Sequence, residues 1–242
     1  MGLEIDTEEG IRPTTPTEAW SELRSGNERF VSGKPKHPNQ GADRRHKLAD
    51  GQRPFSTLFG CSDSRVAAEV IFDQGLGDMF VVRTAGHVAG PTELGSLEFG
   101  AEILEIPLIV VLGHDSCGAV TSTMDAYESG TMPGGFLRDL VERVTPSVIA
   151  AMRKGADNPD AVVAQHVKQT VHLIEQRSRV VAERVADGRL AIVGLVYKLA
   201  EGNAHVVSML GHIEGLDEDV RQVAPGVADP LPTAIPIEDT GR

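Results

Sequence analysis

The run from Pro107 to Leu112 restricts the fold of this chain more than any other stretch. Its six residues, Pro-Leu-Ile-Val-Val-Leu, are all apolar, and this pattern predicts a strand that is buried on both faces. Strands of that kind occur in parallel sheets that are covered by helices on either side. The run therefore predicts a layered fold with a parallel sheet at its centre.

Other segments of the chain fit the same layered fold. Short apolar runs predict further strands at Phe55–Gly60, Met79–Arg83 and Leu190–Tyr197, with a hairpin partner around Val206. Apolar residues at helical spacing predict helices at Val66–Phe72, Thr92–Leu104, Cys117–Tyr127, Phe136–Lys154 and, as one long helix, Asp160–Ala186. The expected fold class is α/β, with a mostly parallel sheet of about four parallel strands plus an antiparallel edge strand, flanked by helices.

The N-terminal part predicts a helical arm before the sheet begins. Thr15 can cap a helix that has Pro16 in its first turn and Glu18 three residues after the cap. Apolar residues then recur at helical spacing until Gly33, and Lys34–Gln52 is polar enough to predict an extended surface crossing. We expect residues 1–14 to form a flexible arm, 15–210 a single domain, and 211–242 an acidic, Pro-rich tail.

Composition narrows the classes of function. The chain has 242 residues, 40% of them hydrophobic, and a formal net charge of −12, which makes nucleic acid and anionic membranes improbable partners. No apolar run approaches the roughly 18 residues that span a bilayer. The first residues are polar and acidic, and the two cysteines are too few for a disulfide scaffold. We therefore expect a cytoplasmic protein with reduced thiols.

Two short motifs follow predicted strands and contain the most reactive side chains. Cys61, Asp63 and Arg65 come directly after one strand, whereas His114 and Cys117 come after the apolar run. Ligands in parallel α/β sheets gather at the carboxyl ends of the strands. We therefore expect the two motifs to meet at one edge of the sheet.

Two cysteines and a histidine form a ligand set that favours zinc. A structural zinc site normally has a fourth Cys or His ligand, but the chain has no further cysteine. The fourth position then falls to Asp63 or to water, a pattern typical of catalytic zinc. Spacing alone leaves three interpretations open: catalytic zinc, structural zinc, and a coincidence of two small buried cysteines with a hydrogen-bonded histidine.

The same residues resemble the β-class carbonic anhydrases, and most of all the actinobacterial members of that class. The Cys-x-Asp-x-Arg motif at Cys61 and the His-x-x-Cys-Gly motif at His114 both match, as does the segment Phe80–Gly86 between them. The resemblance extends from about Thr17 to about Leu199. It implies a zinc lyase that reversibly hydrates carbon dioxide to bicarbonate and a proton, with a zinc-bound hydroxide as the nucleophile.

The resemblance also implies a role for each matching residue. Cys61, His114 and Cys117 would hold one Zn²⁺ per chain, and Asp63 would either complete the coordination or pair with Arg65 and leave that position to water. The Asp63–Arg65 dyad would thus gate the metal and orient the hydroxide. The implied substrate pocket consists of Gln52, Phe80, Ala85, Phe99 and Gly118.

Part of that pocket would come from a neighbouring subunit, so the resemblance implies self-association as a dimer or tetramer. Phe99 stands where many members have Tyr, and Ala85 where many have Val, so pocket size and polarity can differ from those members. His87 follows the matching segment and is a candidate proton shuttle.

The sequence leaves two alternative functions open. The same scaffold could hydrolyse carbonyl sulfide or carbon disulfide, because pocket shape rather than the ligand set separates these activities. A non-catalytic module, with zinc permanently closed by Asp63, is the other alternative. The intact Arg65 argues against that module, since a permanently closed site has no need of a competing cation.

Overall fold

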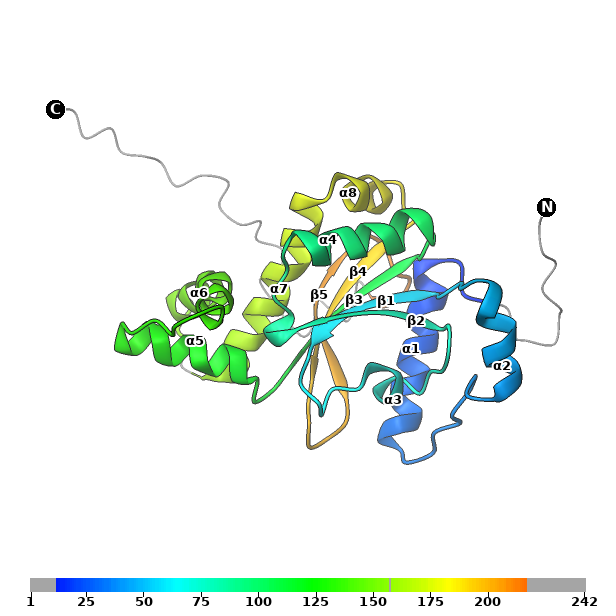
Figure 1. Ribbon diagram of the computed structural model, residues 1–242, viewed down its shortest axis with the longest axis horizontal. Coiled ribbons are helices and arrows are strands. Elements are labelled where there is room, and N and C mark those ends of the chain that lie inside the picture. The colour runs from blue at the N-terminus through cyan, green and yellow to red at the C-terminus, as the bar shows by residue number, and fades with distance from the viewer. Residues whose placement is uncertain (1–11, 157, 217–242) are drawn as a thin grey trace.

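The strands form one five-stranded sheet, which lies at the centre of the computed structural model (Figure 1). The structure describes residues 12–156 and 158–216. The strand order is β2-β1-β3-β4-β5; the first four strands run parallel and β5 is antiparallel to β4. The strands are β1 (Ser56–Cys61), β2 (Met79–Thr84), β3 (Leu108–His114), β4 (Ala191–Tyr197) and β5 (Ala204–Leu210).

Helices connect the parallel strands, as crossover connections between parallel strands require. The α-helices are α1 (Pro16–Val31), α2 (Ala42–Lys47), α3 (Ala68–Ile71), α4 (Pro91–Glu98), α5 (Gly118–Ser129), α6 (Leu137–Arg153), α7 (Pro159–Arg177) and α8 (Arg179–Ala186). Shorter helical turns are η1 (Leu48–Asp50), η2 (Ala85–His87) and the π-helical η3 (Phe99–Ile103), which continues α4. Among the described residues, no helix is both long and apolar enough to cross a membrane.

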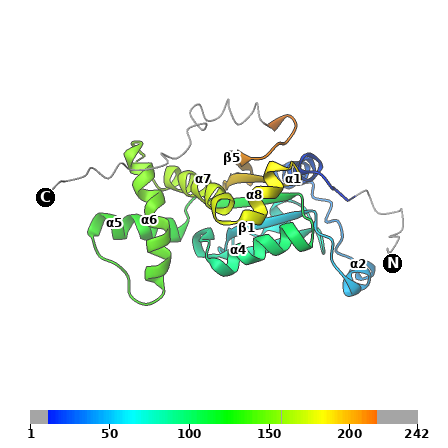
Figure 2. The same cartoon turned by 90° about the horizontal axis from the view of Figure 1, so that it is seen from above.

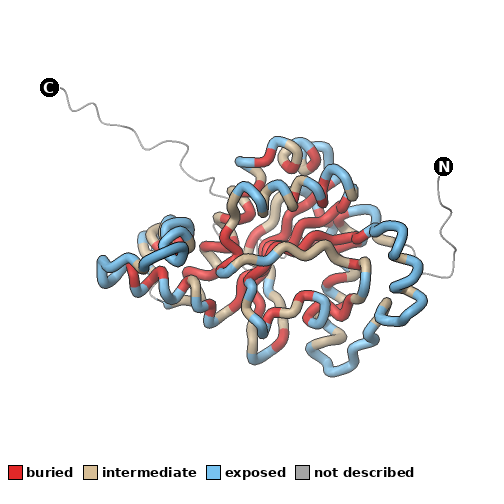
Figure 3. Tube along the Cα trace, viewed as in Figure 1, coloured by how far each residue is buried: buried red, intermediate tan, exposed pale blue. Residues whose placement is uncertain are grey.

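The sheet separates two apolar cores. Alternate residues of β3 point to opposite faces: Leu108 and Val110 join the core beneath α1 and α3, whereas Ile109 and Val111 join the core beneath α4, α7 and α8. Figure 2 shows α1 and α4 on opposite sides of the strands. Figure 3 shows the buried residues gathered in the sheet and the exposed ones along its periphery. Helices α5 and α6 extend beyond the carboxyl end of the sheet (Figure 1).

The predicted fold class is confirmed, including the antiparallel edge strand and the N-terminal helix. Helix α1 begins with the predicted capping box: Thr15 Oγ1 accepts a hydrogen bond from the Glu18 backbone N–H, and Glu18 Oε2 accepts one from the Thr15 N–H. The predicted division into arm, domain and tail stays a prediction. Residues 1–11 and 217–242 lie outside the described residues.

Two element predictions are wrong. The expected single helix over Asp160–Ala186 is two helices, because Ser178 adopts an extended conformation between α7 and α8. Its hydroxyl donates to Glu98 Oε1 at 2.6 Å and accepts from the Val181 N–H, so this residue caps α8. The expected extended crossing at Lys34–Gln52 contains the short helix α2 and the turn η1.

Candidate metal centre

Two adjacent strands bring three potential ligands together. Cys61 is the last residue of β1 and His114 the last of β3, and parallel pairing places both strand ends at one edge of the sheet. Cys117 follows a short turn and is the N-cap of α5. The two Sγ atoms and a ring nitrogen of His114 all lie within 4.8 Å of one another, and all three residues are buried. The expected meeting of the two motifs is therefore present.

The imidazole of His114 is oriented as a metal ligand. Its Nδ1 lies 2.8 Å from the Asp115 carbonyl oxygen, so Nδ1 carries the proton and donates it. In the neutral ring Nε2 is then the unprotonated atom, and it is buried without a hydrogen-bond partner among the described residues. A buried acceptor without a partner is costly, and a metal ion beside two thiols would satisfy it. The donor set therefore fits zinc.

The thiols of Cys61 and Cys117 lie side by side and change each other's pKa. A hydrogen bond from Cys117 is the largest effect on Cys61 and lowers its pKa, whereas the same interaction and burial raise the pKa of Cys117. Cys61 is therefore the thiol that deprotonates first, and a second proton stays on Cys117. A divalent cation between them would favour loss of that second proton, because thiolates are the forms that bind metal.

Asp63 is paired with Arg65 and lies outside the cluster of three ligands. Its Oδ1 accepts hydrogen bonds from Arg65 Nε and from the Arg65 backbone N–H, both at 2.9 Å, and its Oδ2 accepts one from Arg65 Nη2 at 2.7 Å. Asp63 Oδ2 lies 3.9 Å from His114 Nε2. These hydrogen bonds from Arg65 lower the pKa of Asp63 below its usual range, so the carboxylate is charged at neutral pH.

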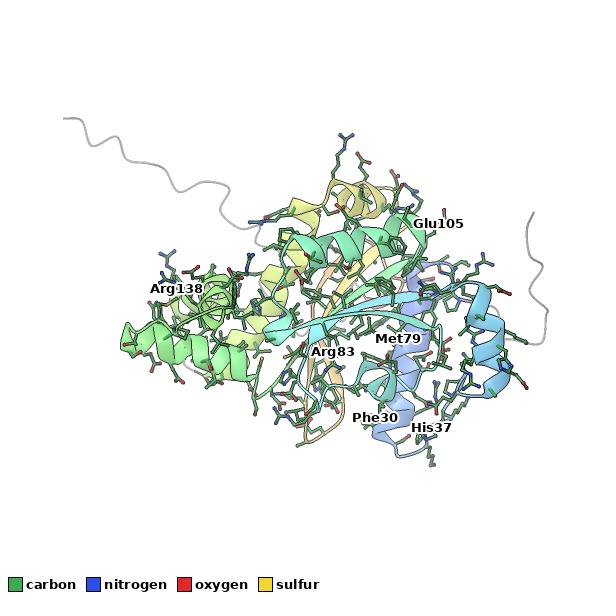
Figure 4. All side chains as sticks on the ribbon, viewed as in Figure 1. Phe30, His37, Met79, Arg83, Glu105 and Arg138 are labelled. Carbon is green, nitrogen blue, oxygen red and sulfur yellow. The ribbon has the colours of Figure 1, made fainter. Side chains whose placement is uncertain are left out.

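Arg83 holds the loop that carries these groups, a role that the sequence did not reveal. It lies at the carboxyl end of β2, beside β1 (Figure 4). Its Nε donates to the Cys61 carbonyl oxygen at 2.9 Å, and its Nη2 donates to the Asp63 carbonyl oxygen at 2.6 Å. The available signal was the position of Arg83 at the end of a predicted strand, but the sequence does not show that β2 neighbours β1.

The predicted pocket residues fall into two groups at opposite ends of the sheet. Ala85 and Gly118 lie at the carboxyl end and are exposed, and a Cβ added to Gly118 would meet no atom within 4 Å. Phe80 is opposite Thr57 in the register, four residues before the strand end, which is about 13 Å along the strand from Cys61. Phe99 stacks on Phe80 with ring centroids 6.1 Å apart.

Gln52 also lies away from the ligands of its own chain. The residue is exposed and precedes the first residue of β1, whereas Cys61 is the last. The backbone after it leads into the amino end of the sheet, because the Phe55 N–H donates to the Asp78 carbonyl oxygen at 2.9 Å, directly before β1 and β2 begin. Within one chain, Gln52 and the Phe80–Phe99 stack do not line the space beside the three ligands.

The predicted role of His87 as a proton shuttle is wrong. The side chain is only 1% exposed, and neither ring nitrogen has a hydrogen-bond partner among the described residues. Burial lowers the pKa of His87 well below its ordinary value, and the neighbouring His166 and His114 lower it further. A shuttle must reach solvent and bind a proton near neutral pH, and His87 meets neither condition.

Comparisons with known proteins give the family of this chain. The family model described as "Carbonic anhydrase" matches residues 56–204. The chain is 54% identical over 200 residues to carbonic anhydrase 2 of Mycobacterium tuberculosis, covering 83% of this chain and 97% of that protein. The carbonic anhydrase of Mycolicibacterium smegmatis has the same identity and the same coverage.

A solved structure extends the comparison to three dimensions. The β-carbonic anhydrase of Coccomyxa, determined in complex with acetazolamide, superposes with a TM-score of 0.62 at 26% identity. The match covers 73% of this chain and 81% of that chain. Because the family model matches more than half of the chain and the mycobacterial relatives are 54% identical over 83% of it, the chain belongs to the carbonic anhydrase family, in its β class.

Proposed function

We propose that this protein is a zinc enzyme that catalyses the reversible hydration of carbon dioxide to bicarbonate and a proton. The observation that carries the proposal is the cluster of Cys61, His114 and Cys117, in which the buried His114 Nε2 has no hydrogen-bond partner among the described residues. The 54% identity to mycobacterial carbonic anhydrases supports the reaction. Two free cysteines are consistent with a reducing compartment, so we propose that the enzyme acts in the cytoplasm.

Cys61, His114 and Cys117 would hold one zinc ion per chain. The ion would supply Lewis acidity, which makes a water molecule a usable nucleophile near neutral pH. Asp63 is acceptor-only when charged, so its carboxylate can take a hydrogen bond from that water and direct an oxygen lone pair at the carbon of carbon dioxide. Carbon dioxide and water combine in this step, and the products are bicarbonate and a proton.

Arg65 would determine whether the centre is open to water. Its guanidinium holds both oxygens of Asp63, and a carboxylate that is engaged in this way is not free to bind the metal. The arrangement favours the open form and disfavours a permanently closed, non-catalytic module. The exposed backbone N–H of Gly118, the first residue of α5, is a donor for an oxygen of the substrate.

We further propose that two chains complete each substrate pocket. Gln52, Phe80 and Phe99 lie at the opposite end of the sheet from their own ligands, so these residues are available to the pocket of a second copy. Phe99 is 44% exposed although it is a large apolar residue, which is consistent with burial by a partner. The β-carbonic anhydrases of Sordaria macrospora are described as tetrameric, so a tetramer built from such dimers is compatible with the proposal.

The test combines zinc analysis with a carbon dioxide hydration assay on the same purified sample. We expect about one zinc per chain, fast hydration by the wild-type protein, and a loss of hydration of at least about 100-fold in Asp63→Ala with zinc retained. His114→Ala is the matched control, because it should lose zinc and activity together. A zinc-loaded wild-type protein without hydration would overturn the proposal, and parallel assays on carbonyl sulfide and carbon disulfide would identify the alternative reaction.

A further inference from the structure

A turn after β2 makes a hydrogen bond to one of the proposed zinc ligands. The backbone N–H of Gly86 donates to Cys61 Sγ across 3.3 Å. A donor of this kind withdraws electron density from a thiolate and orients it, as other outer-shell contacts do for metal ligands. The position of the Gly86 N–H therefore bears directly on how Cys61 binds a metal ion.

The backbone of this turn is in an uncommon conformation. Gly86 has φ +65°, and the following residue, His87, has φ +43°, so two successive residues lie in the left-handed region. A Cβ on Gly86 would come within 2.8 Å of the Ala119 side chain, so glycine is required there for space as well. A turn in such a conformation persists only when its surroundings stabilise it. In this turn, the stabilising contact is a hydrogen bond to the carbonyl oxygen of Gly86.

His166 on helix α7 holds that carbonyl. His166 Nε2 lies 3.0 Å from the Gly86 carbonyl oxygen, and His166 Nδ1 lies 2.8 Å from Ser147 Oγ on α6. A carbonyl oxygen can only accept, so Nε2 carries the proton and Nδ1 accepts from the Ser147 hydroxyl. The structure places Gln169 Oε1 as the acceptor 2.5 Å from Ser147 Oγ. The single Ser147 hydrogen goes to His166 Nδ1 in this arrangement, so the Gln169 amide must be turned over, with its Nε2 donating to Ser147 Oγ. Both ring nitrogens of His166 therefore have a hydrogen-bond partner.

The surroundings keep the His166 ring in this neutral form. The residue is 5% exposed, and burial lowers its pKa to about 4. The adjacent ring of His87, with its centroid 4.4 Å away, packs against it without donating or accepting a hydrogen bond among the described residues. A neutral ring with a single proton on Nε2 is a fixed donor to Gly86, and Ser147 selects that tautomer.

We infer that His166 is a positioning residue of the metal centre: by holding the Gly86 carbonyl, it fixes the turn whose N–H donates to Cys61 Sγ. The inference rests on the proposed function only in that the site must bind a metal. Changes to outer-shell partners of metal ligands typically lower metal affinity by 10–100-fold. We therefore expect His166 to affect the metal site although its own contact is with a backbone carbonyl.

The test compares four variants in two measurements that do not depend on turnover. Zinc affinity is measured by competition with a chelating dye, and the thiolate-to-metal charge-transfer band is recorded after replacement of zinc by Co²⁺. In His166→Leu, we expect zinc affinity to fall about 10-fold and the band to move to longer wavelength, because a thiolate without its donor releases electrons more easily. Circular dichroism verifies that each variant is folded.

The conservative variants separate positioning from packing. His166→Gln retains an N–H that can reach Gly86, so we expect near wild-type affinity and spectrum. Ser147→Ala frees the other tautomer of His166, so we expect values between those of wild type and His166→Leu. His172→Leu is the matched control, because this half-buried histidine lies on the same helix six residues further along, and it should leave both measurements unchanged.

The outcomes distinguish this inference from the proposed function. If wild type hydrates carbon dioxide but His166→Leu has wild-type affinity and spectrum, the positioning role is wrong and the proposed function stands. If wild type binds metal without hydrating carbon dioxide while the His166→Leu band shifts, the function is wrong and the positioning role stands. If His166→Leu does not fold, the pair His166→Gln and Ser147→Ala decides: wild-type values in both would overturn the inference.

Discussion

Asp63 and Arg65 form the hydrogen-bonded pair that we propose as the gate of the metal centre. Hydrogen bonds from Arg65 are the main cause of the lowered pKa of Asp63, and burial opposes them only in part. A lowered carboxyl pKa means that the charged form is stabilised in the folded protein. The pairing is therefore present throughout the neutral range and is lost only as the pH falls below the usual range of an aspartate.

Replacing Arg65 should close the metal site. In Arg65→Gln, the Asp63 carboxylate loses its bidentate partner, and we expect it to bind the metal and exclude water. The expected result is a loss of carbon dioxide hydration of about 100-fold with zinc content unchanged, measured by stopped flow and elemental analysis.

Arg179→Gln provides the matched control for that variant, because Arg179 forms an exposed ion pair with Glu183 far from the metal site. It should retain wild-type activity. Full activity in Arg65→Gln would show that Asp63 does not bind the metal even without Arg65, and this result would contradict the proposed gating role.

At the scale of elements, Asp73 ties helix α1 to the loops around α3. This buried carboxylate accepts hydrogen bonds from the backbone N–H groups of Lys36 and His37, each at 2.9 Å, and pairs with Arg29 of α1. Burial would raise the pKa of Asp73, but these hydrogen bonds outweigh it and lower the pKa from its ordinary value. The contact thus joins three segments that are separate in the sequence.

The lowered pKa of Asp73 predicts that the free energy of unfolding depends on pH in the acid range. Because the folded-state pKa lies below the unfolded value, the stabilisation is present above about pH 4 and is lost as the pH falls through the folded-state pKa. We expect Asp73→Asn to lower the free energy of unfolding by about 2 kcal/mol at pH 7 and to reduce the loss of stability below pH 4.

Urea unfolding at pH 7 and at pH 3 measures both effects on Asp73→Asn. Asp139→Asn is the matched control, since Asp139 forms an exposed ion pair with Arg143 within α6; it should change stability by less than about 0.5 kcal/mol. Equal pH dependence in Asp73→Asn and wild type would rule out Asp73 as a source of acid sensitivity.

Most elements followed from patterns within the chain, and the exceptions have identifiable causes. Strand β3 was predictable because its residues are apolar on both faces, which reflects burial by a core on each side. The break at Ser178 was not, because the apolar spacing continues through it. The hydroxyl of Ser178 is drawn to Glu98, a residue 80 positions earlier, and no local pattern contains that contact.

At the scale of the whole molecule, the Phe80–Phe99 stack is the feature that a single chain does not explain. Its rings lie at the end of the sheet opposite the ligands, and Phe99 is left exposed. A charge placed at an apolar contact costs several kcal/mol on burial. We therefore expect Phe99→Asp to reduce self-association and carbon dioxide hydration together, while zinc content stays at the wild-type value.

Sedimentation velocity over a range of concentrations, paired with activity on the same samples, tests the Phe99→Asp prediction. Val70→Asp is the matched control, because Val70 is also an exposed apolar residue but lies on α3 at the other face of the sheet. A monomeric Phe99→Asp protein with full activity would show that one chain forms a complete pocket.

The sequence alone pointed to the proposed metal ligands, because they occur in two short motifs that each follow an apolar strand. Cys61, His114 and Cys117 could be named from spacing and resemblance, since parallel strands end at one edge of a sheet. Tertiary structure alone revealed Arg83 and His166. Their contacts with Cys61 and Gly86 cross 22 and 80 positions of the chain, and such contacts depend on which strands and helices lie side by side.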